Sequence, residues 1–188
     1  GGRDAKGLTL GLVGFGAIAR QVARRAHAFG MRVLASDPFV AAGHPAWSEL
    51  GVERRELAAM LPETDVLSIH VPMTDTTRGM LDARALRSLP QGACVVNTAR
   101  GGVLDEAELV ALLRSGRLGG AALDVVATEP LPAGSHFEGV PNLVLSPHVA
   151  GITRDANHRA SMLTAENVRL VLEGKAPRVA DAARSSSA

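Results

Sequence analysis

The chain carries an arginine just past a short apolar run, a position suited to binding a carboxylate. Residues 94–106 read CVVNTARGGVLDE, in which apolar residues precede Arg100, two glycines follow it, and Asp105 starts a new helix. Asp105 and Glu108 fit a D-x-x-E variant of the usual helix-start pattern. Arg100 would then lie at the sheet edge where open α/β sheets bind their ligands. A guanidinium held there can grip a carboxylate through two parallel hydrogen bonds.

Three more residues capable of chemistry follow later predicted strands. Asp124 and Glu129 lie in the segment GAALDVVATEP, at and just beyond one strand end, and His148 lies in SPHVAG after the next strand. A capping or surface role is the simpler explanation for any one of them alone. Together with Arg100 they come from three successive strand ends, which meet at one edge of a parallel sheet. Such convergence is typical of an active site on a doubly wound sheet.

Gly14, Gly16 and Ala19 form a G-x-G-x-x-A pattern that follows the first predicted strand and opens a helix. Gly14 permits a tight turn, and Gly16 lets the backbone approach a pyrophosphate whose charge the helix N-terminus stabilises. Ala19 replaces the third glycine of the fingerprint, with slightly wider helix–strand contact. The pattern alone is weak evidence, but this strand–helix context favours dinucleotide binding over a merely tight turn.

Asp37 closes the second predicted strand, 18 residues after Ala19. A carboxylate in this place can accept hydrogen bonds from the ribose hydroxyls and would repel a 2′-phosphate. Pro38 follows, and no Arg or Lys is adjacent to hold that phosphate, so NAD is favoured over NADP. The alternative is a plain turn aspartate before a proline. His70, at the end of the third predicted strand, fits a structural role as well as a ligand contact, and we assign it no chemistry.

Composition and charge exclude several other classes of protein. The 188 residues carry 20 basic and 19 acidic side chains without a long basic block, so neither nucleic acid nor a membrane surface is an implied partner. The apolar runs are short and interrupted, which predicts no transmembrane span and no signal peptide. The single cysteine, Cys94, favours a reducing, cytoplasmic setting. The histidines show no metal-ligand spacing, so no metal site is predicted.

The elements that must position these residues alternate between strand-like and helical patterns. We expect strands at residues 8–13, 31–35, 65–71, 94–97, 121–126 and 142–145. We expect helices at residues 17–29, 54–61, 83–88, 105–115 and 153–172. Because several strands are apolar throughout, both faces of the sheet should be covered. The pattern predicts one domain over residues 1–188, with a core at about 7–177, built as a doubly wound parallel sheet in three αβα layers.

With these residues in hand, the chain closely resembles the NAD-binding domain of the D-isomer-specific 2-hydroxyacid dehydrogenases, over about residues 7–177. The resemblance implies a Rossmann-type fold, NAD as cofactor, a 2-hydroxy/2-oxo acid substrate and a homodimer for the full-length enzyme. It rests on five segments in family order: LGLVGFGAIARQVARRAHAFGMRVLASDP, HVPMTDTTRGML, VVNTARGGVLDEAEL, GAALDVVATEP and SPHVAG.

The family's site residues can be carried over to matching positions of this chain. The catalytic residues would be Arg100, Glu129 and His148. Backbone at the start of the first helix would hold the pyrophosphate, and other residues would contact the ribose, line the cleft or reach the nicotinamide. The cofactor-binding residues would be Gly14, Gly16, Ala17, Ile18, Asp37, Val71, Pro72, Thr98, Ala99, Arg100, Asp124, His148 and Ala150.

The resemblance also implies a reaction. Arg100 would anchor the substrate carboxylate and polarise the neighbouring carbonyl, which receives hydride from nicotinamide C4 while protonated His148 donates to the oxygen. Glu129, hydrogen-bonded to His148, would favour the imidazolium. In the oxidising direction neutral His148 would act as the base.

One departure from the family pattern leaves alternatives open. The family's substrate domain is missing ahead of the first strand, so we expect an excised cofactor domain that binds NAD(H) but turns over poorly by itself. A corepressor of the C-terminal-binding-protein type and a stand-alone NAD-binding module are the alternatives; the complete set of Arg100, Glu129 and His148 favours the enzyme. The sequence does not indicate which 2-hydroxy acid is used, since Arg154 and Arg159 fit a solvated helix face better than a contact to an anionic tail.

Overall fold

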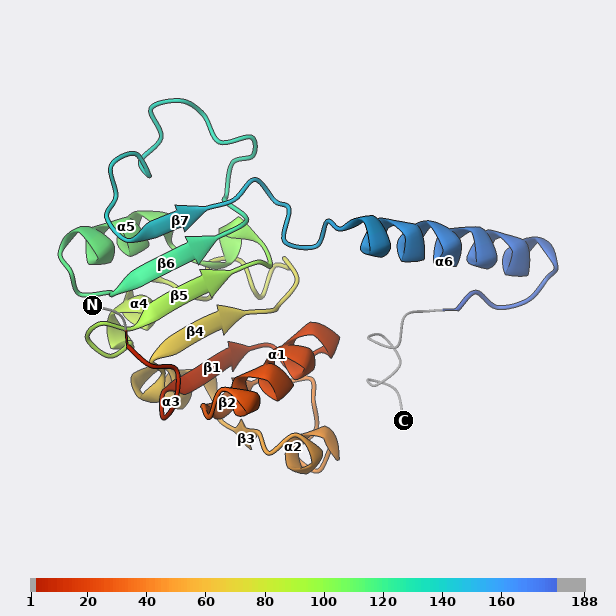
Figure 1. The fold of residues 1–188 in the computed structure, drawn as a ribbon, viewed down its shortest axis with the longest axis horizontal. Helices are drawn as coiled ribbons and strands as arrows, with labels where there is room; N and C mark the ends of the chain where they lie inside the picture. Colours follow the sequence, from red (N-terminus) through yellow and green to blue (C-terminus); the bar gives the residue numbers. More distant parts are fainter. Residues whose placement is uncertain (1–2, 179–188) are drawn as a thin grey trace. The chain divides into compact units, whose positions relative to one another are not determined.

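Over residues 3–178, the part of the chain that the structure describes, the computed structural model has one seven-stranded sheet (Figure 1). All neighbouring strands are parallel, in the order β3-β2-β1-β4-β5-β6-β7. The order reverses beside β1, which makes the switch point where doubly wound sheets bind ligands. The strands are β1 (Thr9–Val13), β2 (Arg32–Ser36), β3 (Glu53–Arg54), β4 (Val66–Ile69), β5 (Cys94–Asn97), β6 (Gly120–Leu123) and β7 (Leu143–Leu145).

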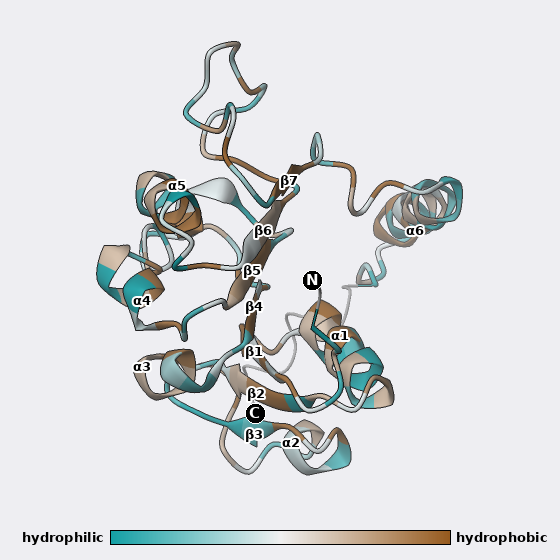
Figure 2. Ribbon diagram, turned by 60° about the vertical axis from the view of Figure 1, so that its left-hand side comes forward, coloured by the Kyte–Doolittle hydropathy of each residue, from teal (hydrophilic) through white to brown (hydrophobic). Residues whose placement is uncertain are grey.

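Helices lie on both faces of this sheet. In Figure 2, which views the sheet nearly along its plane, α3, α4 and α5 lie on one face and α1 lies on the other, beside β1 and β2. The predicted Rossmann-type doubly wound sheet is therefore confirmed. The helices are α1 (Ala17–Ala28), α2 (Ala46–Glu49), α3 (Leu57–Met60), α4 (Ala83–Ser88), α5 (Glu106–Arg114) and α6 (Arg154–Leu172), with 3₁₀ turns η1 (Leu61–Glu63) and η2 (Gly101–Val103).

The packing of these helices follows from their sequences. The α1 helix buries Ala19, Ala23 and Ala26, which recur at helical spacing, and their small side chains let the helix lie close to the sheet. The α5 helix begins where predicted, because the Asp105 side chain accepts a hydrogen bond from the backbone N–H of Glu108 at 2.9 Å. Every residue of β1 is buried, as expected for a central parallel strand.

Two apolar clusters form the core, one on each face. The cluster under α1 includes Leu12, Phe15 and Trp47, and the last two rings stack with their centroids 4.2 Å apart. The larger cluster lies under α3, α4 and α5 and includes Leu67 and Leu109, both fully buried. Both clusters pack against the sheet, so they fix the strand ends that carry the candidate site.

Two short elements were not predicted, and one helix prediction was wrong in its bounds. The sequence pattern missed β3 and α2, and the helix expected at 54–61 begins only at Leu57. Arg54 instead belongs to β3, and the backbone N–H of Arg55 donates to the carbonyl of Ala35 at 2.9 Å. Residues 54 and 55 therefore extend the edge of the sheet, which local helical spacing could not reveal.

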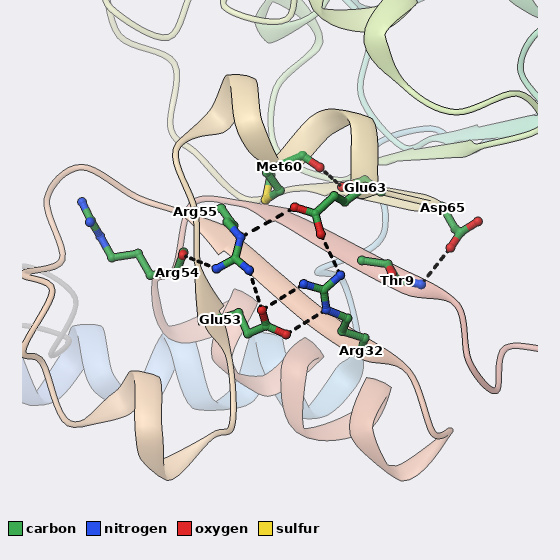
Figure 3. A network of polar contacts seen from close by, with 9 residues as sticks. Thr9, Arg32, Glu53, Arg54, Arg55, Met60, Glu63 and Asp65 are labelled. Atoms are coloured by element: carbon green, nitrogen blue, oxygen red, sulfur yellow. Dashed lines mark hydrogen bonds and ion pairs between the residues drawn. The ribbon is translucent and has the colours of Figure 1, made fainter.

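A network of ion pairs closes this edge of the sheet (Figure 3). Arg32 on β2 contacts both carboxylate oxygens of Glu53 on β3, at 2.8 and 2.9 Å, and reaches Glu63 in η1 at 2.7 Å. Arg55 donates a further hydrogen bond to Glu53 at 2.7 Å. The hydrogen bond from Arg32 is the main reason that the pKa of Glu53 lies below its usual value. These contacts join a two-residue strand to the rest of the fold.

Contacts divide the chain into two compact units, Gly1–Pro147 and His148–Ala188. The sheet and α1 to α5 belong to the first unit, and α6 belongs to the second. The α6 helix begins after Thr153, whose Oγ1 accepts a hydrogen bond from the N–H of Ala156 at 2.9 Å. The single domain expected from the sequence stays a prediction.

Candidate cofactor and active site

The turn between β1 and α1 requires glycine at its first position. Gly14 has a φ of +90°, and a Cβ there would lie 2.9 Å from the carbonyl oxygen of His70 and 3.0 Å from Cγ1 of Val71. At Gly16, by contrast, an added Cβ would meet no atom of the described residues within 4 Å. Gly14 is thus needed for the chain to turn, whereas Gly16 leaves open space on the outer side of the turn.

The N-terminus of α1 faces this open space. Its N-cap is Gly16, which has no side chain to accept a hydrogen bond from the first turn of the helix. Ala17 and Ile18 are exposed. The first-turn N–H groups and the positive end of the helix dipole therefore suit a phosphate group. The geometry of the turn therefore suits the predicted binding of a dinucleotide pyrophosphate at Ala17 and Ile18.

Asp37 makes a turn contact, the alternative role left open by the sequence, and a tertiary contact that the sequence did not reveal. One carboxylate oxygen accepts a hydrogen bond from the N–H of Phe15 at 2.8 Å, and the other accepts from the N–H of Phe39 at 2.9 Å. Asp37 thereby ties the glycine turn to the end of β2. A carboxylate has about four acceptor positions, so these bonds leave capacity for ribose hydroxyls. The ribose contact itself stays a prediction.

The loop that carries Arg100 is held by a buried asparagine. Asn97, the last residue of β5, donates from Nδ2 to the carbonyl of Arg100 at 2.9 Å and accepts at Oδ1 from the N–H of Ala99 at 3.0 Å. The Arg100 side chain is exposed and donates to the carbonyl of Ala99. The clamp presents a guanidinium at the carboxyl end of the sheet, as predicted. The sequence predicts Asn97 at the end of a strand and indicates no other role for it.

Gly101 brings the Arg100 loop against the loop that follows β6. A Cβ at Gly101 would lie 2.0 Å from the carbonyl carbon of Val126 and 2.3 Å from the nitrogen of Ala127. Only glycine allows this approach of two backbones. The second loop carries Glu129, whose Oε1 accepts a hydrogen bond from the N–H of Val126 at 3.0 Å. Arg100 and Glu129 therefore belong to adjoining loops.

Asp124 joins three strand ends. It is buried, its N–H donates to the carbonyl of Asn97 at 2.9 Å, and its Oδ1 accepts from the hydroxyl of Ser146 at 2.5 Å. Ser146 in turn donates its N–H to the carbonyl of Leu123. The ends of β5, β6 and β7 are thus linked at the edge that carries Arg100. The sequence indicates no role for Ser146, although Ser146 is the first residue of the SPHVAG segment.

The first unit brings Arg100, Asp124 and Glu129 to one edge of the sheet. His148 and Ala150 belong to the second unit, and both are exposed. His148 has a φ of +56°, a left-handed conformation that is uncommon for a residue with a side chain. Convergence of His148 with the other catalytic candidates stays a prediction.

Comparison with known proteins decides the family. A family profile described as "D-isomer specific 2-hydroxyacid dehydrogenase, NAD binding domain" matches residues 1–150. The chain belongs to the D-isomer-specific 2-hydroxyacid dehydrogenase family. The predicted family and its NAD cofactor are therefore confirmed.

The similar proteins are longer than this chain. It is 50% identical to (S)-sulfolactate dehydrogenase of Chromohalobacter salexigens over 172 residues, which are 91% of this chain and 55% of the relative. It is 41% identical to D-3-phosphoglycerate dehydrogenase of Mycobacterium leprae over 174 residues, 93% of this chain and 32% of the relative. The crystal structure of the TT0316 protein from Thermus thermophilus matches with a TM-score of 0.84 and 41% identity, over 94% of this chain and 54% of that one. The chain thus spans about half, or less, of the length of these relatives.

Other predicted cofactor contacts of this 2-hydroxyacid dehydrogenase domain lie at the same sheet edge. Val71 follows β4, is half-buried and lies beside Gly14, and the neighbouring Pro72 is exposed. Thr98 and Ala99 follow β5, and Thr98 is exposed. Their places at the carboxyl ends of β4 and β5 fit the lining of a cleft, and their contacts with NAD stay predictions.

His70, to which the sequence assigned no chemistry, is half-buried and directly follows β4 in this dehydrogenase domain. Its Nε2 lies 2.9 Å from the hydroxyl of Ser68, and burial lowers the pKa of His70 to about 4. The imidazole is therefore neutral at pH 7. It lies at one end of an apolar groove of about 780 Å³ between α1 and the open face of β4 and β5, with Ile18, Phe29 and Val96 among its lining residues.

Two other kinds of site are absent from residues 3–178. No helix in this range is long and apolar enough to cross a membrane. Within the same range, no group of three or more His, Cys, Asp and Glu side chains is arranged to bind a metal ion.

Proposed function

We propose that this chain is the cofactor domain of an enzyme that transfers a hydride between NAD(H) and a 2-hydroxy/2-oxo acid pair. The observation that carries the proposal is the exposed guanidinium of Arg100, presented by the Asn97 clamp at the sheet edge that also carries the open glycine turn. NAD would supply or accept the hydride. The chain would bind the pyrophosphate at Ala17 and Ile18, as the uncapped start of α1 suggests.

The substrate-facing roles follow from the chemistry of the side chains. Arg100 would hold the substrate carboxylate by a bidentate contact and orient the neighbouring carbonyl carbon. His148 would give a proton to the carbonyl oxygen during reduction and remove it during oxidation, and Glu129 would favour its protonated form. Asp124, anchored by Ser146, would contact the nicotinamide side.

The relatives indicate which acids to test first. The names of two similar proteins, (S)-sulfolactate dehydrogenase and glycerate dehydrogenase, point to short 2-hydroxy acids with a polar or anionic tail. We propose sulfolactate and glycerate, with their 2-oxo acids, as the first substrates to screen. A homodimer and a cytoplasmic location belong to the same proposal; they rest on the resemblance and on the single cysteine.

Two experiments test the proposal. Calorimetric titration of the purified chain should give saturable NADH binding and much weaker NADPH binding. In the full-length enzyme, Arg100→Lys should lower kcat/KM for the 2-oxo acid by about 10- to 100-fold and leave NADH affinity unchanged, because an ammonium cannot make the bidentate contact. Arg84→Lys, an exposed arginine on α4, is the matched control and should keep wild-type kinetics.

The results separate the candidate functions. Wild-type turnover and substrate affinity in Arg100→Lys would refute the anchoring role. Tight NADH binding by a full-length protein that reduces no 2-oxo acid would favour an NAD-dependent corepressor or a binding module instead. If the folded chain bound neither NADH nor NADPH, the proposed binding of the cofactor at the glycine turn would be refuted.

A further inference from the structure

One carboxylate beside the candidate site has no part in the reaction proposed above. Glu106 is the first residue of α5, six positions after Arg100, and its side chain is only 11% exposed. Its Oε1 accepts a hydrogen bond from the backbone N–H of Ala127 at 2.6 Å. Its other oxygen lies 3.5 Å from Nε2 of His136. A nearly buried carboxylate thus contacts two points of one loop.

That loop has no regular secondary structure. Residues 124–142, between β6 and β7, contain no helix or strand, yet they carry Glu129. Glu106 binds the loop near its start, at Ala127, and again beyond Glu129, at His136. The His136 ring also packs on Phe137, with ring centroids 4.0 Å apart, and Phe137 is buried. The segment with Glu129 is therefore held on both sides.

The contact at Ala127 is directly linked to the Glu129 carboxylate. Ala127 follows Val126, and the N–H of Val126 donates to Oε1 of Glu129 at 3.0 Å. Val126 and Ala127 also form the backbone that Gly101 contacts. Two adjacent N–H groups thus bind two different carboxylates, one from α5 and one from the site. The two peptide groups share the Cα of Val126, so holding the Ala127 N–H restricts the directions open to the Val126 N–H.

We propose that Glu106 is a positioning residue: it holds the Val126–Ala127 peptide against the Arg100 loop and so sets the place of the Glu129 carboxylate. The inference rests on the proposed function, in which Glu129 acts on the catalytic histidine. Glu106 does not touch the reacting atoms. A charged acceptor suits this task because its hydrogen bonds are shorter and stronger than those of a neutral group.

The test compares Glu106→Ala with Glu106→Gln in the full-length enzyme. Glutamine keeps an oxygen that can accept from Ala127, whereas alanine removes the contact. We expect Glu106→Ala to lower kcat about 10-fold with little change in NADH affinity, and Glu106→Gln to stay within about 3-fold of wild type. Glu138→Ala is the matched control, because Glu138 makes the same kind of contact, to the N–H of Gly134 at 2.7 Å, in the same loop. It should leave kcat unchanged.

A double-mutant cycle separates positioning from general stability. If Glu106 acts through Glu129, adding Glu106→Ala to Glu129→Gln should cause no further loss of kcat. Two results would overturn the proposal. One is that Glu106→Ala lowers kcat by the same factor in wild type and in Glu129→Gln; the other is that Glu106→Gln lowers kcat as much as Glu106→Ala.

Hydrogen exchange keeps the inference testable if the proposed reaction fails. In the full-length protein, Glu106→Ala should raise the amide exchange rates of Val126 and Ala127 at least about 10-fold, and Glu138→Ala should not. If the wild-type protein were inactive but showed this exchange pattern, the proposed function would be refuted and the role of Glu106 in holding the loop would still be supported. Unchanged exchange in Glu106→Ala would refute the positioning role, whatever the activity.

Discussion

The half-buried imidazole of His70 should make the stability of this domain depend on pH. Burial lowers the pKa of His70 to about 4, whereas a histidine in the unfolded chain titrates near pH 6.5. Between these two values the unfolded state binds more protons than the folded state, so stability falls as the pH falls. The stabilisation should be complete above about pH 6.5 and lost progressively down to about pH 4.

The size of the effect follows from the same two values. A difference of about 2.5 pKa units corresponds to about 3.4 kcal/mol at 1.36 kcal/mol per unit. His70 retains partial contact with solvent, so we expect screening to reduce the loss to about 2 kcal/mol. Total stability of a domain is about 5–15 kcal/mol, so a loss of this size is measurable.

The assay is urea unfolding of the chain from pH 7 to pH 4.5, for wild type and His70→Asn. The variant should be less stable than wild type at pH 7, because it disturbs the packing at the end of β4 and the contact with Ser68. The difference between the two should shrink by about 2 kcal/mol at pH 4.5. His27→Asn, an exposed change on α1, should follow the wild-type pH dependence. Equal slopes for wild type and His70→Asn would refute the reasoning.

Two further predictions concern carboxylates that bind backbone or arginine. Asp37→Ala removes the acceptor for the N–H groups of Phe15 and Phe39, so NADH affinity measured by calorimetry should fall at least about 10-fold, and NADPH affinity should fall less; equal losses would contradict the ribose contact. Glu53→Gln should lower stability by less than about 1 kcal/mol at pH 7, because its pairs with Arg32 are partly exposed. Since the pKa of Glu53 is lowered in the fold, its contribution is lost on acidification, and urea unfolding of wild type and variant should converge below pH 4; a constant difference would contradict the ion-pair role.

Local sequence was sufficient for the frame of the fold. The cap at Asp105 and the helix start at Thr153 each depend on a hydrogen bond between residues three positions apart. Apolar runs likewise predicted six of the strands. Burial on both faces explains β1, whose residues are all buried, whereas Val144 and Leu145 of β7 are exposed. The two-residue β3 escaped prediction because its bonds are made to β2, and its own sequence is charged.

The sequence by itself determined the family, the cofactor class and which side chains stand at the strand ends. Only the tertiary structure decided what holds them there. Asp37 supports the glycine turn, Asn97 clamps the Arg100 loop, Ser146 anchors Asp124, and Glu106 holds the loop of Glu129. The physical reason is that most of these contacts join backbone amides or carboxylates some 20 residues apart in the chain, and hydrogen bonds to backbone leave no residue pattern that spacing could reveal.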